Sequence, residues 1–121
     1  MRDKPPFARG NCFVAAARGI AIGLRDERNL LLHATATIAV VAAGVWLRVS
    51  LLEAAALTLC VAGVWTAELF NTALERLARA IDREENPLLR DALDLSAGAV
   101  LSAAIGAAVA GGLILLVKVA A

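Results

Sequence analysis

The chain is poor in cysteine, and its net charge is close to zero. Its two cysteines, Cys12 and Cys60, lack the spacing of a metal-binding site, and we interpret both as small packing residues. The formal net charge of +1 provides no overall field for binding nucleic acid. Neither the Gly-x4-Gly-Lys-Ser/Thr loop nor the glycine loop of protein kinases is present. Any phosphoryl transfer would therefore use another kind of site.

Apolar sequence, by contrast, is abundant. Hydrophobic residues make up 60% of the 121 residues, and the mean hydropathy is +0.75, both well above the values of an ordinary soluble domain. Three apolar segments, at 30–47, 54–77 and 95–117, are each long enough as helices to cross a hydrocarbon core of roughly 30 Å. The sequence therefore predicts an all-α membrane protein, with residues 1–121 forming one domain.

The segments outside these three spans are expected to have separate roles. Residues 1–10 form a polar leader, broken by proline, that we expect to be mobile. In residues 12–28, apolar side chains recur every three or four positions, which predicts an amphipathic helix on the membrane surface. Pro87 suits the first turn of the third membrane helix, in which small residues recur every fourth position, at Gly98, Ser102, Gly106 and Ala110. This small-residue face predicts close helix packing.

The basic residues are distributed unevenly. Of twelve Lys and Arg residues, six precede Leu30 and four lie between Arg76 and Arg90, which leaves Arg48 and Lys118 for the other side. Because basic residues concentrate on the cytosolic side of membrane proteins, we expect the N-terminus and the 76–94 connection to be cytosolic.

Glu68, Asn71 and Glu75 are the most informative residues of the chain. Their spacings of three, four and seven place them on one face of a helix, within an apolar stretch. Ionisable groups are costly in a membrane and by default mark a functional site. The alternative is an interhelical hydrogen-bond cluster, which is also how we interpret His33.

The chemistry of these carboxylates favours phosphoryl transfer. Glu27, at the entrance to the first span, is expected on the same side as Glu75, and one or two carboxylates with phosphate oxygens are what Mg²⁺ usually takes. Glu68 lies about 10 Å deeper by helical rise. A carboxylate at that depth is suited to act as a general base on a lipid hydroxyl, with ATP as the phosphoryl donor.

Several stretches of the chain resemble the small bacterial diacylglycerol kinase and undecaprenol kinase family. The resemblance is strongest at Glu68–Glu75, read as Glu-Leu-Phe-Asn-Thr-Ala-Leu-Glu, and at Asp94–Leu101, read as Asp-Leu-Ser-Ala-Gly-Ala-Val-Leu. The remaining matches are Arg9, Phe13, Ala16, Gly19, Glu27-Arg28-Asn29 and His33. The matches cover nearly the whole chain with consistent spacing.

This resemblance implies a homotrimer in the bacterial cytoplasmic membrane that phosphorylates a lipid hydroxyl from Mg-ATP, at sites shared between subunits. By position, Glu68 matches the proton acceptor and Asn71 an orienting partner, while Glu27 and Glu75 match metal ligands that also contact the nucleotide. The other implied nucleotide-binding residues are Arg9, Glu84, Glu85, Asn86, Arg90 and Asp94. Trp46 and Ala97, with Glu68, are the expected contacts of the lipid substrate.

The chain departs from the family pattern at two positions. Leu93 stands where the family usually has lysine, and Arg79 stands where an aspartate commonly follows the second metal ligand. Arg90 lies three residues before Leu93, on nearly the same helix face, so we hypothesise that it replaces the missing cation.

Other classes of function remain open on the sequence alone. The Asn-Thr-Ala and Ser-Ala-Gly-Ala-Val-Leu segments resemble those of undecaprenol kinases more than those of the diacylglycerol-preferring branch, so undecaprenol is the favoured substrate. A catalytically silent homologue serving as a membrane scaffold is one alternative, and the substitution at Leu93 favours it. A small proton-coupled transporter is another, although the charged cluster lies toward one membrane face and not at the midplane.

Overall fold

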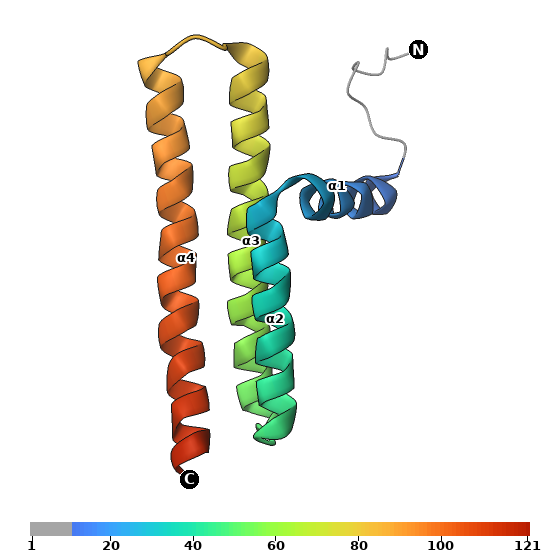
Figure 1. Ribbon diagram of the computed structural model, residues 1–121, viewed down its shortest axis with the longest axis vertical. Helices are drawn as coiled ribbons and strands as arrows, with labels where there is room; N and C mark the ends of the chain where they lie inside the picture. Colours follow the sequence, from blue (N-terminus) through green and yellow to red (C-terminus); the bar gives the residue numbers. More distant parts are fainter. Residues whose placement is uncertain (1–10) are drawn as a thin grey trace.

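A computed structural model describes residues 11–121, which form four helices (Figure 1). The helices are α1 (Cys12–Asp26), α2 (Arg28–Trp46), α3 (Leu51–Ile81) and α4 (Pro87–Ala120). Residues 1–10, with the expected leader and Arg9, lie outside the described residues. The expected segments 30–47, 54–77 and 95–117 fall almost wholly within α2, α3 and α4, and α3 and α4 continue beyond them.

Polar residues fix the starts of three helices. The side chain of Asn11 accepts hydrogen bonds from the N–H groups of Phe13 and Val14 at the start of α1. At the start of α3, Ser50 and Glu53 form a reciprocal capping box, with N–H to side-chain oxygen distances of 2.7 and 3.2 Å. Asn86 caps α4, and Pro87 stands in its first turn as expected.

The helices α3 and α4 form an antiparallel pair joined by a short connection, and α2 packs beside α3 (Figure 1). Gly111 of α4 faces Leu57 of α3: a Cβ at this glycine would lie in ordinary contact, 3.5 Å from a Leu57 methyl group. At the opposite end from the α3–α4 connection, residues 47–50 turn the chain from α2 into α3, with Arg48 in the left-handed region at φ 54°.

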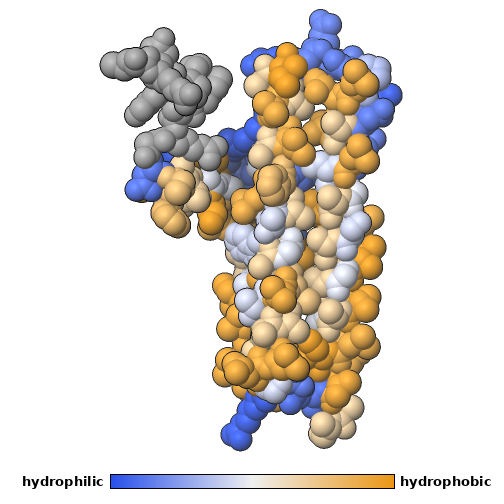
Figure 2. All heavy atoms as spheres, turned by 180° about the vertical axis from the view of Figure 1, so that it is seen from behind, coloured by the Kyte–Doolittle hydropathy of each residue, from blue (hydrophilic) through white to orange (hydrophobic). Residues whose placement is uncertain are grey.

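The long helices present most of their large apolar side chains outward. Leu30, Leu57 and Ala78 are the buried hydrophobic residues among those described. By contrast, residues such as Leu52, Leu101 and Leu116 are more than 60% exposed. Figure 2 shows this apolar surface between hydrophilic ends. Within residues 11–121, α2, α3 and α4 are each long and apolar enough to cross a bilayer, which makes them three candidate membrane spans.

The helix α1 leaves the bundle sideways, at the level where α2 begins partway along α3 (Figure 1). Its junction with α2 is tightly packed around Leu30, which is fully buried. A Cβ on Gly23 would lie 3.1 Å from one Leu30 methyl group and 3.5 Å from a methyl group of Leu69. The absence of a side chain at Gly23 therefore lets α1 contact both α2 and α3.

Candidate active site

Three polar residues of α3 are buried in the bundle. Glu68 is 3% exposed, and Asn71 and Thr72 are also buried. Ser96 of α4 is a further buried polar residue, which the sequence interpretation did not select. No buried side-chain nitrogen or oxygen among residues 11–121 lacks a hydrogen-bond partner. Glu68 and Asn71, two of the three polar residues predicted to form a stripe on one face of this helix, are thus removed from the lipid-facing surface.

Glu68 lies next to the histidine of α2. The Nε2 atom of His33 is 3.5 Å from Oε2 of the buried Glu68 carboxylate. One turn further along α2, the Thr37 hydroxyl donates to the His33 carbonyl at 2.7 Å and accepts from the Trp65 indole N–H at 2.8 Å. His33 of α2 thus faces Glu68 of α3, and the hydrogen bond between the two helices at this level joins Trp65 to Thr37.

Asn71 and Glu75 form a second part of the stripe. The Asn71 amide donates to Oε1 of Glu75 at 3.0 Å, which fixes the direction of that carboxylate one turn nearer the helix end. Glu75 is partly exposed, in contrast to Glu68. Glu68 and Glu75 therefore occupy different surroundings: Glu68 is buried in the bundle and Glu75 is partly exposed.

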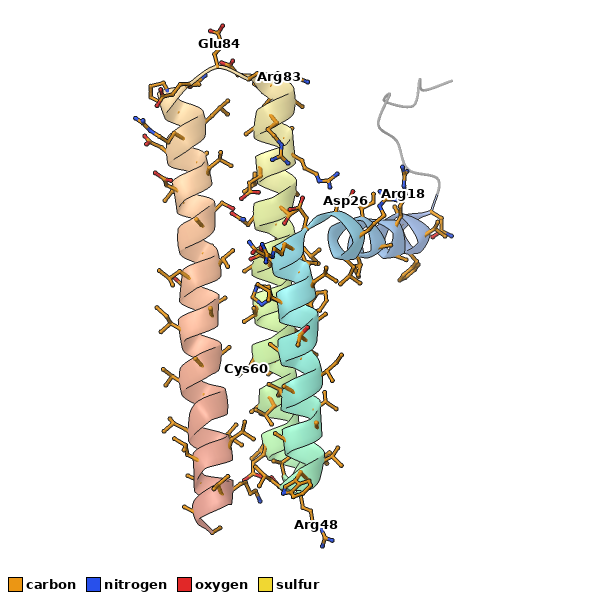
Figure 3. The ribbon with its side chains drawn as sticks, in the orientation of Figure 1. Arg18, Asp26, Arg48, Cys60, Arg83 and Glu84 are labelled. Atoms are coloured by element: carbon orange, nitrogen blue, oxygen red, sulfur yellow. The ribbon has the colours of Figure 1, made fainter. Side chains whose placement is uncertain are left out.

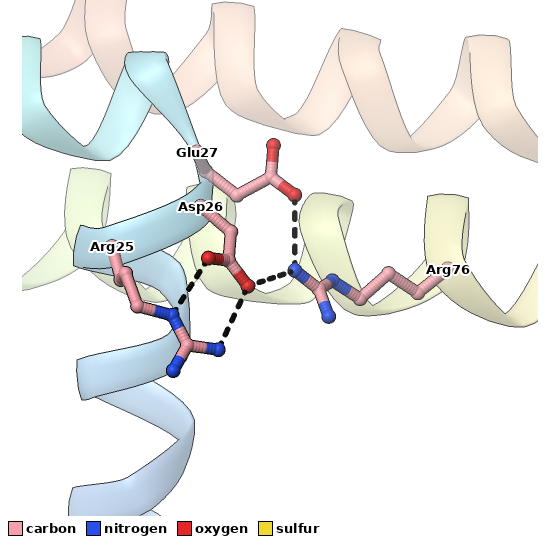
Figure 4. Close-up of polar contacts among 4 residues, drawn as sticks. All are labelled: Arg25, Asp26, Glu27 and Arg76. Atoms are coloured by element: carbon pink, nitrogen blue, oxygen red, sulfur yellow. Dashed lines mark hydrogen bonds and ion pairs between the residues drawn. The ribbon is translucent and has the colours of Figure 1, made fainter.

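Glu27 takes part in an ion network that joins the α1–α2 junction to α3 (Figure 4). Nη2 of Arg76 lies 3.5 Å from Glu27 and 3.3 Å from Asp26, and Asp26 also accepts from Arg25 at 2.8 Å. The hydrogen bond from Arg25, with that from Arg76, lowers the pKa of Asp26 to about 2. The sequence interpretation missed Arg76, whose position directly after Glu75 was its only signal.

The expected pairing of Glu27 with Glu75 around a metal stays a prediction. Among residues 11–121, no group of three or more His, Cys, Asp or Glu side chains is close enough to hold an ion by itself. The donor set is nevertheless oxygen only, and Mg²⁺ takes one or two carboxylates together with phosphate oxygens. The residues present therefore fit Mg²⁺ that arrives with a nucleotide.

A hollow of about 450 Å³ lies between α3 and α4 at their connected ends. It brings together five of the residues that the sequence predicted for the nucleotide: Glu75, Glu84, Glu85, Asn86 and Arg90. Glu27 and Asp94 do not line it. Its remaining walls are Ala78, Arg79, Asp82, Leu89 and Leu93. Both positions at which the chain departs from the family pattern, Arg79 and Leu93, thus face the same space.

The connection around this hollow is ordered by hydrogen bonds of its own. Asp82 accepts from the Glu84 N–H at 2.9 Å and from the Asn86 amide at 3.4 Å. Asn86 in turn accepts from the first N–H groups of α4. Arg90 donates to Glu85 at 2.9 Å. Asp82, which was not among the predicted site residues, therefore orders the connection that borders the hollow. Asn86, predicted to contact the nucleotide, also caps α4. Figure 3 labels Arg83 and Glu84 in this connection.

Two apolar cavities lie deeper in the bundle. One, of about 240 Å³, is bounded by α2, α3 and α4, and has His33, Thr37, Cys60 and Trp65 in its lining. The other, of about 630 Å³, opens between α2 and α3 toward Arg48. Trp46 and Ala97, expected to contact lipid, line neither cavity and are exposed on the outer surface.

Comparison with known proteins identifies the family. A family model described as prokaryotic diacylglycerol kinase matches residues 14–115. The chain belongs to the prokaryotic diacylglycerol kinase family. It is 39% identical over 106 residues to an undecaprenol kinase of Bacillus subtilis, an alignment that covers 88% of this chain and 86% of the relative.

A second relative of this family is a diacylglycerol kinase of Synechocystis, 35% identical over 105 residues, which are 86% of this chain and 60% of the relative. No solved structure matches the chain. Membership makes the chain a membrane-embedded lipid kinase, an enzyme that transfers a phosphoryl group from ATP to a lipid.

Proposed function

We propose that this lipid kinase phosphorylates the hydroxyl group of undecaprenol, with diacylglycerol as the second candidate substrate. The relative with the higher identity, which also aligns over most of its own length, is an undecaprenol kinase. The apolar cavity beside His33 and the lipid-facing Trp46 and Ala97 offer surfaces to a long hydrocarbon substrate. Its hydroxyl would approach Glu68 from within the membrane.

The observation that carries the mechanism is the difference in burial between Glu68 and Glu75 of α3. Glu68 is closed off in the bundle, whereas Glu75 borders the open hollow at the end of the helix. In the proposed step the lipid oxygen attacks the γ-phosphorus of ATP and Glu68 accepts the hydroxyl proton. The bond between the γ-phosphorus and the bridging oxygen breaks, and ADP leaves.

The nucleotide is proposed to bind in the hollow between α3 and α4. Glu84, Glu85, Asn86 and Arg90 would contact it there, with Asp94 nearby on α4 and Arg9 from the segment outside the described residues. Glu75, oriented by Asn71, and Glu27 would hold Mg²⁺. Bound magnesium would offset the charge of the phosphates during transfer.

We further propose that the enzyme is a homotrimer in the bacterial cytoplasmic membrane. Gly98 and Gly106 of the small-residue face have nothing within 4 Å of an added Cβ, so this face of α4 is open to a second copy. The distribution of basic residues supports a cytosolic N-terminus, with α1 as an amphipathic helix on the membrane surface.

The test is phosphorylation of purified lipid by purified protein. We expect transfer of phosphate from Mg-ATP to undecaprenol in detergent micelles, with a lower kcat/KM for diacylglycerol. Equal or greater efficiency with diacylglycerol would overturn the substrate assignment. No transfer to either lipid would overturn the proposed function and favour a silent scaffold.

A further inference from the structure

The hollow between α3 and α4 is lined by more negative than positive charge. Its carboxylates are Glu75, Asp82, Glu84 and Glu85. Its cations are two guanidinium groups, Arg79 and Arg90. A site of this composition would repel a bare triphosphate, so the state of each guanidinium decides how it can serve a nucleotide.

The two arginines differ in what they already bind. Arg90 donates to the Glu85 carboxylate at 2.9 Å, within a hydrogen-bonded ion pair. For Arg79, by contrast, no ion pair or side-chain hydrogen bond is found with any residue from 11 to 121. Its guanidinium at the wall of the hollow is thus not held by another described side chain, although Glu75 stands one turn away on the same face of α3.

We propose that Arg79 is the principal phosphate-binding cation of this hollow, ahead of Arg90. This inference rests on the proposed function, in which the hollow takes Mg-ATP. A guanidinium forms charge-assisted, bidentate hydrogen bonds with phosphate oxygens. Arg79 makes these bonds without first giving up a partner, whereas Arg90 must exchange the Glu85 carboxylate for phosphate.

The facing wall explains why the position of the cation matters. Leu93 of α4 lines the same hollow and offers no charge. Of the two guanidinium groups, Arg79 comes from α3 and Arg90 from α4, and the apolar Leu93 leaves room opposite Arg79. A lysine at position 93 would place its charge in the same hollow, so we expect a cation at position 93 to replace Arg79 in binding phosphate.

The experiment compares single variants that each remove one positive charge. We expect Arg79→Leu to raise the KM for ATP about ten- to hundredfold, as expected for the loss of a charge-assisted phosphate contact, with the KM for lipid unchanged. Arg90→Leu should raise it less. Arg83→Leu is the matched control, because it removes the same charge from the same end of the molecule but does not line the hollow.

A rescue variant separates a charge in the hollow from a structural effect. Arg79→Leu combined with Leu93→Lys should recover most of the lost affinity, since the charge returns from the opposite wall. Binding of Mg-ATP, measured by calorimetry without lipid, should follow the same order as the kinetic values.

Three results would overturn the inference. If the KM for ATP is no higher in Arg79→Leu than in Arg83→Leu, Arg79 acts only through the overall electrostatic potential at this end of the molecule and not through contact with phosphate. If the KM for ATP rises more in Arg90→Leu than in Arg79→Leu, Arg90 is the principal phosphate-binding cation. If adding Leu93→Lys to Arg79→Leu does not restore the affinity for ATP, Arg79 acts through the structure of the hollow and not through its charge. Each of these three results overturns the inference alone when the parent protein phosphorylates lipid. A parent that neither binds ATP nor phosphorylates lipid would overturn the proposed function together with this inference.

Discussion

Replacing Glu68 by glutamine removes the proposed proton acceptor and preserves nearly all of its shape. The side chain is 3% exposed, and its carboxylate lies 3.5 Å from His33. A carboxamide can still hydrogen-bond with this histidine, but it does not accept a proton from a lipid hydroxyl. The substitution therefore separates the chemistry of the carboxylate from its packing.

The expected loss is kinetic. General base catalysis contributes about 10²- to 10⁴-fold, so kcat should fall by that factor in Glu68→Gln, or about 2.7 to 5.4 kcal/mol in the activation barrier. The melting temperature should stay the same or rise, because a neutral group replaces an ionisable one in a buried position. The KM for ATP should be unchanged, since Glu68 is proposed to contact the lipid hydroxyl and not the nucleotide.

The assay is transfer of labelled phosphate to lipid at saturating ATP and lipid. Glu53→Gln is the matched control: it makes the same substitution on the same helix, at the far end, about 22 Å away by helical rise. It should leave kcat unchanged, because Glu53 caps α3 and lies 3.1 Å from Lys118, remote from the proposed site. A kcat of Glu68→Gln within a factor of ten of the parent value would refute the general-base role.

Three further outcomes are expected. Leu30→Ala should lower the free energy of unfolding by about 2 to 5 kcal/mol in thermal or denaturant melts, because Leu30 is fully buried, whereas Leu31→Ala, at an exposed neighbour, should cost far less. Arg76→Ala should lower the Mg²⁺ concentration for half-maximal activity, since it frees the neighbouring proposed magnesium ligand; a higher requirement would contradict this. The Asp26 carboxylate, whose pKa is about 2 because of Arg25 and Arg76, should stabilise the folded state at neutral pH. That stabilisation should be lost only as the pH falls from about 4 toward 2, and acid titration of Asp26→Asn should show no such step.

Periodicity and composition were enough to predict the helices. The apolar runs predicted three membrane-crossing helices, and the structure contains three helices of the required length and hydropathy. Pro87 was correctly expected in a first helical turn. These features depend on local rules, in which the period of the apolar residues and the chemistry of a cap determine a helix without reference to its neighbours.

The candidate site was predictable only in part. Spacing placed Glu68, Asn71 and Glu75 on one face, and the structure adds the hydrogen bond between Asn71 and Glu75. Spacing did not pair His33 with Glu68, which lie on different helices. The binding of Arg90 to Glu85 was also not predicted, although it bears directly on the hypothesis that Arg90 replaces a missing cation.

The sequence by itself determined that this chain is helical, crosses a membrane, and carries carboxylates on one helix face where lipid would make them costly. These properties follow from hydropathy and from the helical repeat, which act over a few turns of chain. Only the tertiary structure decided which charges meet. It brought Arg76 to Glu27, closed Glu68 against His33, and placed Arg79 and Leu93 on facing walls of one hollow. Contacts of this kind depend on how far one helix slides and turns against another, and side-chain packing such as that of Leu30 against Gly23 sets that register.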